Sequence, residues 1–488
     1  MGPNQWCLAL LFCAAISMQA QPAPSADEET RRLALDIFKQ LIEINTTDSV
    51  GNVSTASEAL ARRFRDAGFP ESDIQVLGPG SNTKKKNIVV RLHGSGKHRP
   101  VLLIGHLDVV EARHEDWTTD PFQFIEKDGY YYGRGTSDMK DGDAIMSATL
   151  IRMKKEGYVP SRDIILAMTA DEEGGTSNGV DWLIRNHRDL MDAEFVLNHD
   201  GGGVLADHGK PVMMEVNATE KLYGDFVLTT TNPGGHSSLP RPDNAIYELA
   251  DALMRIAHYQ FPFELNPITR AYYERQVTMS EPQRAADLKA ILGNPPDMAA
   301  AARLSKDPLD NSTMHTTCVA TRLSAGHANN ALPQTAQANV NCRIEPGHSL
   351  EEIRLTLEKV VADPKAAPSA IASPTIRVQF RENNNELLDH GSDRHSFVPP
   401  PPRKEVFGPL EKVAAQMWPG IPVLPTMSTG ASDGVYTNAA GMPTYCISGE
   451  QYERDDIRAH GKDERIGVES FARGVDFYYV FLKAVTAE

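Results

Sequence analysis

Histidine and acidic side chains follow four predicted strands along this chain, at residues 101–105, 130–132, 163–169 and 194–198. These side chains are His106, Asp108, Asp138, Asp171, Glu172, Glu173, His199 and Asp200. In open α/β sheets, ligands bind at the carboxyl ends of the strands, so we expect several of these side chains to converge. Unpaired buried carboxylates are costly, and a metal ion is a common compensation. The pattern therefore predicts a metal site.

Each of these residues also has an explanation that involves no metal. His106 could be a hydrogen-bonded core histidine, and Asp138 could be the N-cap of a helix over 140–156. Glu172 and Glu173 could form a solvated turn. Four strand ends that each deliver a carboxylate or an imidazole favour the metal site over four separate explanations.

The residue types indicate the chemistry of such a site. Imidazole and carboxylate ligands suit zinc or a related divalent ion. A carboxylate has two oxygens and can bridge two ions about 3.5–4 Å apart, which together lower the pKa of a shared water to about 7. An adjacent carboxylate that binds no metal can then accept the proton, so the pattern is typical of a hydrolase.

The elements that position these residues alternate between helix and strand. Two amphipathic helices are predicted between Thr30 and Phe69, and helices over 141–156 and 179–188 separate strand-like segments. The strand-like segments are residues 87–92, 101–105, 163–169 and 194–198. Interleaved strands and helices predict an α/β fold with a mainly parallel sheet and helices on both faces.

The pattern changes from about residue 210, where a small α+β module with a helical, proline-punctuated stretch over 260–310 is predicted. A polar, proline-rich segment over 383–403 ends this module, and helices over 405–416 and 468–485 return to the first pattern. We therefore expect a catalytic domain built from both chain ends. The expected parts are residues 1–20 (signal peptide), 21–212 and 386–488 (catalytic domain), and 213–385 (inserted module).

Composition excludes some partners. The 488 residues carry a formal net charge of -16, which argues against non-specific binding to nucleic acid or to anionic lipid. The five cysteines include two near the N-terminus, and the sequence leaves open whether Cys318 and Cys342 form a disulfide.

The N-terminus resembles a cleaved secretory signal. An apolar run from Trp6 to Met18 is too short to span a bilayer, and small residues follow near Ala20. No Lys or Arg precedes the run, so a buried N-terminal helix is the alternative. The signal predicts a secreted or periplasmic protein.

The ordered motifs GHLDVV (105–110), GRGTSDMKDG (133–142) and DEEGG (171–175) resemble the co-catalytic metallopeptidase family 20. This group includes aminoacylase, glutamate carboxypeptidase, carnosinase-type dipeptidases and succinyl-diaminopimelate desuccinylase. The resemblance covers essentially the whole mature chain. It implies that the inserted module is a lid and dimerisation domain, although the stretch over 260–310 is longer than in minimal members.

The resemblance implies a role for each motif residue. It makes Asp138 the carboxylate that bridges two metals, Glu172 the general base, and Asp108 the carboxylate that orients His106. The metal ligands that it implies are His106, Asp138, Glu173, Asp200 and His460, the last from the segment RAHGKDERI. Two divalent ions are expected, zinc first, with cobalt or manganese as alternatives.

In the inserted module, the resemblance makes His236 of GGHSS the group that stabilises the oxyanion, with its position in the same or the partner subunit left open. It makes Asn330 and Gly430 substrate contacts, and Arg343 the group that holds the substrate carboxylate, for which a planar guanidinium is well suited. A homodimer is expected.

The expected function is a di-metal dipeptidase or carboxypeptidase that acts on small peptides with a free carboxylate. An N-acyl amino acid deacylase is the alternative, because it uses the same machinery. A non-catalytic metal- or peptide-binding protein is a further alternative, but it would need neither Glu172 nor His236.

Overall fold

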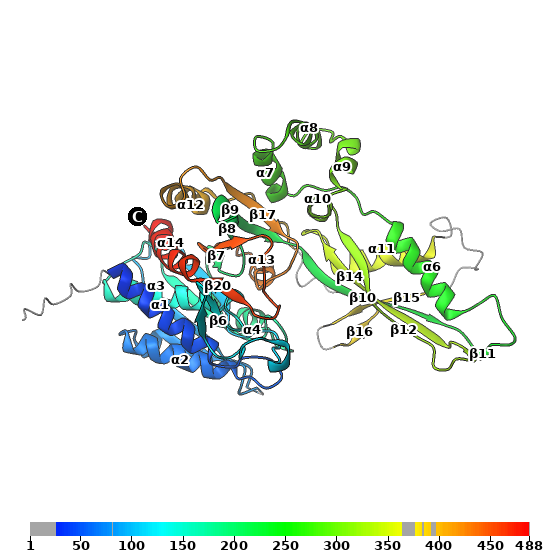
Figure 1. The fold of residues 1–488 in the computed structure, drawn as a ribbon, viewed down its shortest axis with the longest axis horizontal. Coiled ribbons are helices and arrows are strands. Elements are labelled where there is room, and N and C mark those ends of the chain that lie inside the picture. Colours follow the sequence, from blue (N-terminus) through cyan, green and yellow to red (C-terminus); the bar gives the residue numbers. More distant parts are fainter. Residues whose placement is uncertain (1–25, 81, 364–375, 383–384, 392–396, 488) are drawn as a thin grey trace, which may run out of the picture.

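A computed structural model describes residues 26–80, 82–363, 376–382, 385–391 and 397–487. A larger domain contains both ends of the described chain, and a second sheet-and-helix domain projects from it (Figure 1). The expected signal peptide, 1–20, lies outside the described residues.

The larger domain is built on a ten-stranded sheet with the order β1-β2-β6-β3-β7-β18-β9-β8-β19, in which β17 also pairs with β9. The central strands β6, β3, β7 and β18 are parallel to one another. On one side β1 and β2 add antiparallel pairs to β6, and on the other side β18 pairs antiparallel with β9. The strands are β1 (Ile74–Leu77), β2 (Asn87–Leu92), β3 (Val101–His106), β6 (Ile164–Thr169), β7 (Phe195–Asn198), β8 (Gly203–Asp207), β9 (Lys210–Glu220), β17 (Val423–Ser428), β18 (Thr444–Cys446) and β19 (Gln451–Glu453).

Helices cover both faces of this sheet, which confirms the predicted α/β fold. Alternate residues of β3 show why its sequence is apolar throughout: Leu103 packs into one core and Leu102 into the other. One face carries α1 (Ala26–Ile42), α2 (Val53–Asp66), α3 (Lys140–Lys155), α12 (Lys404–Met417) and α14 (Val468–Thr486). The other carries α4 (Gly179–Asn186), α5 (Arg188–Met191) and α13 (Gly434–Ala439).

The stretch Tyr130–Tyr132 is a strand, β5. Its position among the predicted strands implied that it belongs to the large sheet, but it does not. It pairs with β4 (Ile125–Lys127) and β20 (Arg465–Gly467) in a separate three-stranded sheet. Asp138 is therefore carried by the loop between β5 and α3, and not by a strand end of the large sheet.

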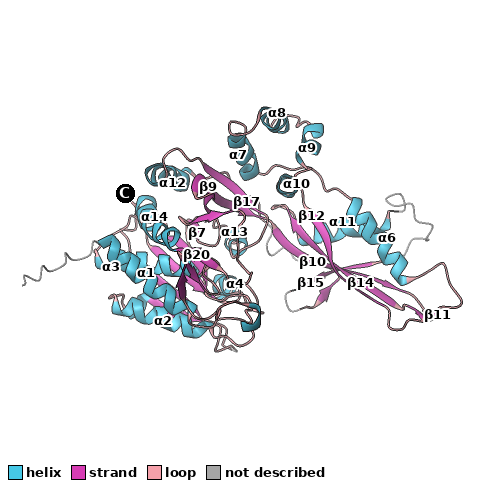
Figure 2. Cartoon of the chain, viewed as in Figure 1, coloured by secondary structure: helices cyan, strands magenta, loops and turns pink. Residues whose placement is uncertain are grey.

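The second domain, which we call the lid, has an antiparallel sheet with the order β12-β14-β10-β15-β16. Its strands are β10 (Leu222–Thr231), β12 (Thr317–Ala325), β14 (Thr335–Ile344), β15 (Arg377–Arg381) and β16 (Leu387–Leu388). Helices α6 (Ala245–His258) and α11 (Leu350–Ala362) pack on one face (Figure 2). The expected boundary at 212 and 213 falls within β9, and the one at 385 and 386 falls just before β16.

A disulfide joins Cys318 of β12 to Cys342 of β14, with their Cα atoms 4.1 Å apart. The sequence had left this pairing open. None of the helices in the described part of the chain is long and apolar enough to cross a membrane.

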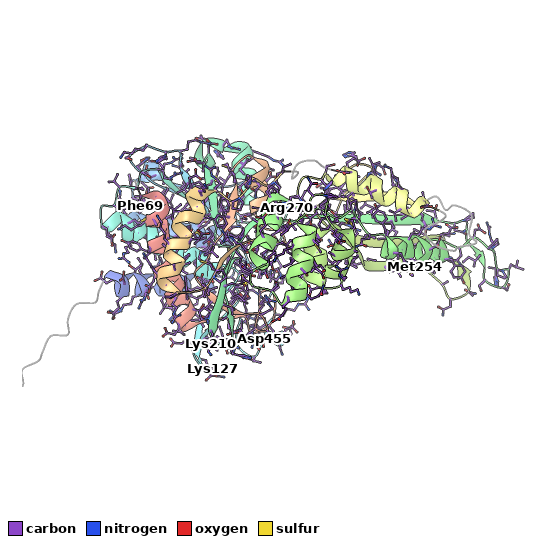
Figure 3. The ribbon with its side chains drawn as sticks, turned by 90° about the horizontal axis from the view of Figure 1, so that it is seen from above. Phe69, Lys127, Lys210, Met254, Arg270 and Asp455 are labelled. Atoms are coloured by element: carbon purple, nitrogen blue, oxygen red, sulfur yellow. A yellow bond between two sulfur atoms is a disulfide. The ribbon has the colours of Figure 1, made fainter. Side chains whose placement is uncertain are left out.

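The stretch over 260–310 forms a helical insertion, as predicted, with helices α7 (Pro267–Gln276), α8 (Pro282–Ile291), α9 (Met298–Leu304) and α10 (Pro308–Met314). It interrupts the lid sequence between α6 and β12, yet α7 lies against β17 of the larger domain. Viewed from above, the insertion around Arg270 lies between the larger domain and the lid helix that carries Met254 (Figure 3). Ile268 of α7 is fully buried in the core of the larger domain.

Candidate metal centre

Parallel strands bring three of the predicted ligands together. β3 ends at His106 and lies between β6 and β7, with which it is parallel. The loops after β6 and β7 carry Glu173 and Asp200, so these side chains emerge at the same edge of the sheet as His106. The loop before α3 adds Asp138, and the segment before β20 adds His460.

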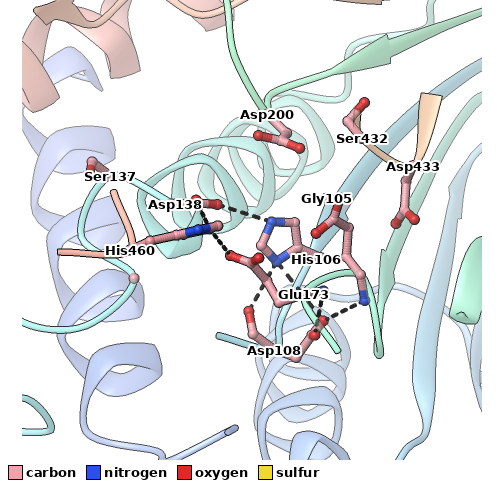
Figure 4. Close-up of polar contacts among 12 residues, drawn as sticks. Gly105, His106, Asp108, Ser137, Asp138, Glu173, Asp200, Ser432, Asp433 and His460 are labelled. Carbon is pink, nitrogen blue, oxygen red and sulfur yellow. Dashed lines mark hydrogen bonds and ion pairs between the residues drawn. The ribbon is translucent and has the colours of Figure 1, made fainter. Parts of the chain in front are cut away.

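Two triads of ligand atoms form there, and they share Asp138. The first is His106, Asp138 and Asp200, and the second is Asp138, Glu173 and His460, with the ligand atoms of each triad within 4.8 Å of one another. Asp138 turns one oxygen to each triad: Oδ1 lies 3.2 Å from His106 Nε2, and Oδ2 lies 3.0 Å from His460 Nε2 (Figure 4). This division suits a carboxylate that bridges two ions.

Glu172 lies beside both triads. One of its carboxylate oxygens belongs to a third group with His106 and Glu173, again within 4.8 Å. Its carboxylate makes no hydrogen bond or ion pair with any residue that the structure describes, whereas Glu173 Oε1 is 2.8 Å from His460 Nε2. The two adjacent glutamates therefore differ in their surroundings: Glu173 faces a histidine ligand, and Glu172 stays free to accept a proton.

Asp108 supports the site in two ways. Its carboxylate accepts hydrogen bonds from the backbone N–H groups of Glu172, at 3.2 Å, and Glu173, at 3.0 Å, and so holds the loop that carries them. His106 Nδ1 is 3.0 Å from the Asp108 carbonyl oxygen but 3.9 Å from its carboxylate. Because a carbonyl only accepts, Nδ1 carries the proton and Nε2 is left to bind a metal. The Asp108 backbone carbonyl is thus the nearer partner of His106, and the carboxylate to which the resemblance gives the orienting role lies 3.9 Å from the same nitrogen.

The electrostatics of the cluster fit a cation. Burial, together with the charge of Asp138, raises the pKa of Asp200 to about 7, and burial raises the pKa of Glu172 as well. Burial alone would also raise the pKa of Asp138, but hydrogen bonds with His106 and His460 hold it below the usual range. The Asp200 carboxylate makes no hydrogen bond or ion pair with the described residues. A divalent ion in each triad would supply the positive charge that these acids lack.

Three supporting residues lie around the ligands. Asp433 accepts hydrogen bonds from Asn178 Nδ2, at 2.6 Å, and Thr169 Oγ1, at 3.1 Å, and so ties the turn over 428–434 to the β6 end of the sheet. Glu464 accepts the backbone N–H of Ser137, at 2.8 Å, beside Asp138. Neither residue was predicted from the sequence, although Asp433 stands in the segment STGASDG (428–434) and Glu464 follows His460 closely.

Lys85 is the third supporting residue. Its ammonium is 2.5 Å from Asp171 and 2.9 Å from Asp48, so it anchors the start of the glutamate loop. The sequence carries no signal for Lys85, because this pairing depends on contacts between segments that are distant along the chain.

Some residues that the sequence had singled out do not reach the cluster. His199 turns away and lies 3.1 Å from Glu450. His236 on β11 (Gly235–His236) pairs with Ala331 on β13 (Ala331–Leu332), directly after Asn330. This strand pair is at the end of the lid that is remote from the larger domain (Figure 1).

A cavity of about 670 Å³ connects the cluster with the lid. Glu172, Glu173 and His460 line it on the side of the larger domain, together with Gly430. Arg343 lines it on the lid side. A substrate in this cavity would therefore contact both domains.

A mainly parallel sheet that gathers two carboxylate–histidine triads beside a free glutamate defines a hydrolase of the two-metal class. The chain matches the model of peptidase family M20/M25/M40 over residues 102–484, and it belongs to this family. It is a metallo-exopeptidase or amidohydrolase.

Relatives span several activities. A probable carboxypeptidase S-like 2 from Dictyostelium discoideum is 28% identical over 405 residues, which cover 79% of this chain and 71% of that protein. The human N-fatty-acyl-amino acid synthase/hydrolase PM20D1 is 26% identical over 478 residues, which cover 95% of this chain and 90% of that protein.

Solved structures show the same fold. An M20 family metallo-carboxypeptidase from Sulfolobus solfataricus superposes with a TM-score of 0.64 at 17% identity, over 93% of this chain and 99% of that one. Human carnosine dipeptidase 1 superposes with a TM-score of 0.58 at 14% identity, over 94% of this chain and 98% of that one. Both cover the catalytic domain and the lid.

Proposed function

We propose that this protein hydrolyses the amide bond of small substrates that carry a free carboxylate on the amine side, acting first as a carboxypeptidase or dipeptidase. The observation that carries this proposal is the unpartnered Glu172 carboxylate, which borders both triads and lines the same cavity as Arg343. A general base and a carboxylate-binding group thus face one substrate-sized space.

Arg343 is the proposed anchor of the substrate carboxylate. Its guanidinium lies 4.8 Å from the centre of the Tyr223 ring and makes no hydrogen bond or ion pair with the residues described here. The cation–π contact restrains the guanidinium while leaving its N–H groups free for a bidentate contact. The scissile amide would then lie toward the metal centre.

Glu172 is the proposed general base. Two divalent ions, with zinc as the expected metal and His106, Asp138, Glu173, Asp200 and His460 as ligands, would supply an activated water and polarise the amide carbonyl. Glu172 accepts the proton of the attacking water and passes it to the amine that leaves. Burial raises the pKa of Glu172 above its usual range, which favours its action as a proton acceptor.

His236 is the proposed oxyanion-stabilising group, supplied by the partner subunit of a homodimer. Its position at the remote end of the lid favours a contribution in trans. Two features of the lid favour self-association: β12 is an edge strand, and it exposes Val319 and Leu323, by 60% and 67%. An exposed edge strand with apolar side chains is a typical surface for pairing with a second chain.

N-acyl amino acid hydrolysis is the second candidate. The human and mouse proteins named N-fatty-acyl-amino acid synthase/hydrolase PM20D1 match almost the full length of this chain, which favours this activity. A peptide and an N-acyl amino acid present the same amide and the same carboxylate, so the two activities differ only in the group on the acyl side.

We also propose that the protein is secreted or exported. The Cys318–Cys342 disulfide supports this, because disulfides persist in oxidising compartments.

The test is hydrolysis of a matched panel by zinc-loaded protein, with peptides and N-acyl amino acids that share one C-terminal residue. Cleavage of both classes, lost with a chelator and restored with zinc, is the expected result. A second panel amidated at the C-terminus should be cleaved far more slowly. Intact substrates throughout both panels would contradict the proposal.

A further inference from the structure

The helices α6 and α11 cover only one face of the lid sheet, and the other face, which we call the open face, is polar near the larger domain. Residues that lie directly opposite each other in a sheet point to the same side. Tyr223 of β10 is opposite Arg343 of β14, and Asp225 of β10 is opposite Arg381 of β15. Tyr223 and Asp225 are two positions apart, so all four side chains lie on the open face.

These four side chains also line the cavity that contains Glu172 and Glu173. The lid side of the cavity therefore carries two guanidiniums, one on each side of β10. Since neighbouring strands are about 4.8 Å apart, β14 and β15 are separated by roughly 9.6 Å. Arg343 is opposite Tyr223 and Arg381 is opposite Asp225, so the two arginines are also offset by two positions along β10, and different groups of one molecule in the cavity could contact each guanidinium.

Arg381 has unused hydrogen-bonding capacity. The side-chain contact that the structure gives for it is Nη1 to Asn385 Oδ1, at 3.5 Å, which is at the limit of a hydrogen bond. Its Nε is buried and has no hydrogen-bond partner. A buried N–H of a charged group without an acceptor is costly, and a ligand carboxylate would supply the missing acceptor.

The nearby acid Asp225 does not satisfy Arg381. Asp225 accepts hydrogen bonds from Tyr223 Oη, at 2.7 Å, and from the amide groups of Asn339 and Asn341, at 2.8 and 2.9 Å. Asp225 forms no ion pair with Arg343 or Arg381 among the described residues. Both guanidiniums therefore remain available to a ligand, which is notable in a chain of net charge -16.

We propose that Arg381 is a specificity-determining residue that binds a second carboxylate of the substrate, so that the preferred amine-side residue is aspartate or glutamate. This inference rests on the proposed function, in which Arg343 binds the carboxylate at the C-terminus. Arg381 then binds the side-chain carboxylate of the same residue. The chemical class is a peptide or N-acyl derivative of an acidic amino acid.

The test compares substrates that differ only in charge: Ala-Glu against Ala-Gln, and N-acetyl-Glu against N-acetyl-Gln. Wild-type protein should show a higher kcat/KM for the glutamate member, by about 10- to 100-fold, because a charge-assisted hydrogen bond is lost with glutamine. Arg381→Gln should reduce this ratio to about one. The loss should lie mainly in KM, because the contact is equally present in the ground state and the transition state.

Two further variants separate a binding role from a structural one. Arg381→Glu should reverse the preference toward Ala-Lys. Arg377→Gln is the matched control, because Arg377 lies on the same strand and face but pairs with Asp389, at 2.8 Å, outside the cavity. It should leave the Glu/Gln ratio unchanged. If Arg381→Gln does not fold, Arg381→Lys, which keeps the charge but loses the planar fork, should retain a reduced preference.

A wild-type Glu/Gln ratio near one would overturn the inference, as would an equal loss for both substrates in Arg381→Gln. In either case, cleavage of the glutamine substrates would leave the proposed function intact. If no member of either pair is cleaved by the zinc-loaded protein, it is the proposed function that fails.

Discussion

At the scale of single residues, neighbours in the sequence have distinct surroundings. Glu172 and Glu173 are adjacent and are held by the same Asp108 carboxylate, yet Glu173 is paired with His460 at 2.8 Å, whereas the Glu172 carboxylate makes no hydrogen bond or ion pair with the described residues. The loop turns sharply at Asp171, whose φ of 63° is in the left-handed region, and the Lys85 ion pair holds Asp171 in place. One dipeptide can therefore supply both a ligand and a general base.

This difference leads to a prediction for the two glutamates. Glu172→Gln should lower kcat by about 10²- to 10⁴-fold, because it removes the general base, while the metal content stays at the wild-type level. Glu173→Gln should lower both kcat and the metal content, because it removes a ligand. The measurements are steady-state kinetics and metal analysis of the same samples. Loss of metal from Glu172→Gln, or full metal retention in Glu173→Gln, would reverse the assigned roles.

The ligands proposed for the cluster can be located in the sequence for a physical reason. Ligands at strand ends and in short motifs are fixed by local order along the chain, so His106, Asp138 and Glu173 can be found without coordinates. Lys85 and Arg381 could not be found in this way. Their significance depends on contacts across the tertiary structure, and a lone lysine or arginine in a sequence is most simply explained as a solvated side chain.

At the scale of elements, the helical insertion is the feature with the greatest structural effect. It belongs to the lid by sequence, but α7 packs on β17, and Arg275 of α7 forms a 2.9 Å ion pair with Glu411 of α12. The insertion therefore adds a packing contact between the lid and the larger domain to the two chain connections, β9–β10 and the segment between β16 and α12. This additional contact should restrict how far the cavity between the domains can open.

Ile268 gives a direct test of this joint. Ile268→Ala should lower the free energy of unfolding by about 2–5 kcal/mol, because a fully buried side chain is removed from the core of the larger domain. Denaturant unfolding measures the change. Val159→Ala, at a side chain that is 66% exposed, is the control and should change stability by less than about 0.5 kcal/mol. An effect of Ile268→Ala as small as the control would show that α7 does not contribute to this core.

A second element-scale prediction concerns pH. His348, just before α11, lies 2.9 Å from Glu264, which precedes α7, and 2.9 Å from Glu352. Burial would lower the pKa of His348, but hydrogen bonds to these two carboxylates raise it above its usual 6.5. A raised pKa in the folded state means that the protonated form stabilises the fold.

The stabilisation is complete below pH 6.5 and is lost as the pH rises through the folded-state pKa. The free energy of unfolding, measured in urea at about pH 5.5 and about pH 8.5, should therefore fall more with rising pH in wild-type protein than in His348→Gln. His208→Gln, in the exposed turn between β8 and β9, is the control. The same pH dependence in wild type and His348→Gln would exclude this linkage.

The elements themselves were predicted unevenly. Long periodic segments such as α3 and α14 were found close to their limits, because amphipathic or apolar patterns define them. β8 and β9 were missed. Their sequence mixes polar and apolar residues, and β9 pairs not only with the preceding β8 but also with β17 and β18, which lie far along the chain. The Tyr130–Tyr132 strand was found but assigned to the wrong sheet, since local pattern does not identify a strand's partners.

At the scale of the whole molecule, the position of His236 has a consequence for assembly. If one subunit supplies His236 to the metal centre of another, then Glu172→Gln and His236→Ala are defects in different halves of one site. Each variant alone should be nearly inactive. A mixed dimer should contain one site in which both residues are intact.

Refolding the two variants together should therefore restore about a quarter of the wild-type activity, because about half of randomly formed C₂ dimers are mixed and each has one intact site. Refolding each variant alone under the same conditions is the control. Mixed dimers that form but stay inactive would show that His236 does not act in trans.

The central claim is that five side chains form one two-metal site through Asp138. The most direct measurement is the metal content per chain after zinc loading and removal of free metal, for wild type, Asp138→Asn and Asp200→Asn. We predict two ions for wild type, a loss of affinity at both positions in Asp138→Asn, and a loss at one position in Asp200→Asn. Two tightly bound ions in Asp138→Asn would contradict the shared carboxylate and the mechanism built on it.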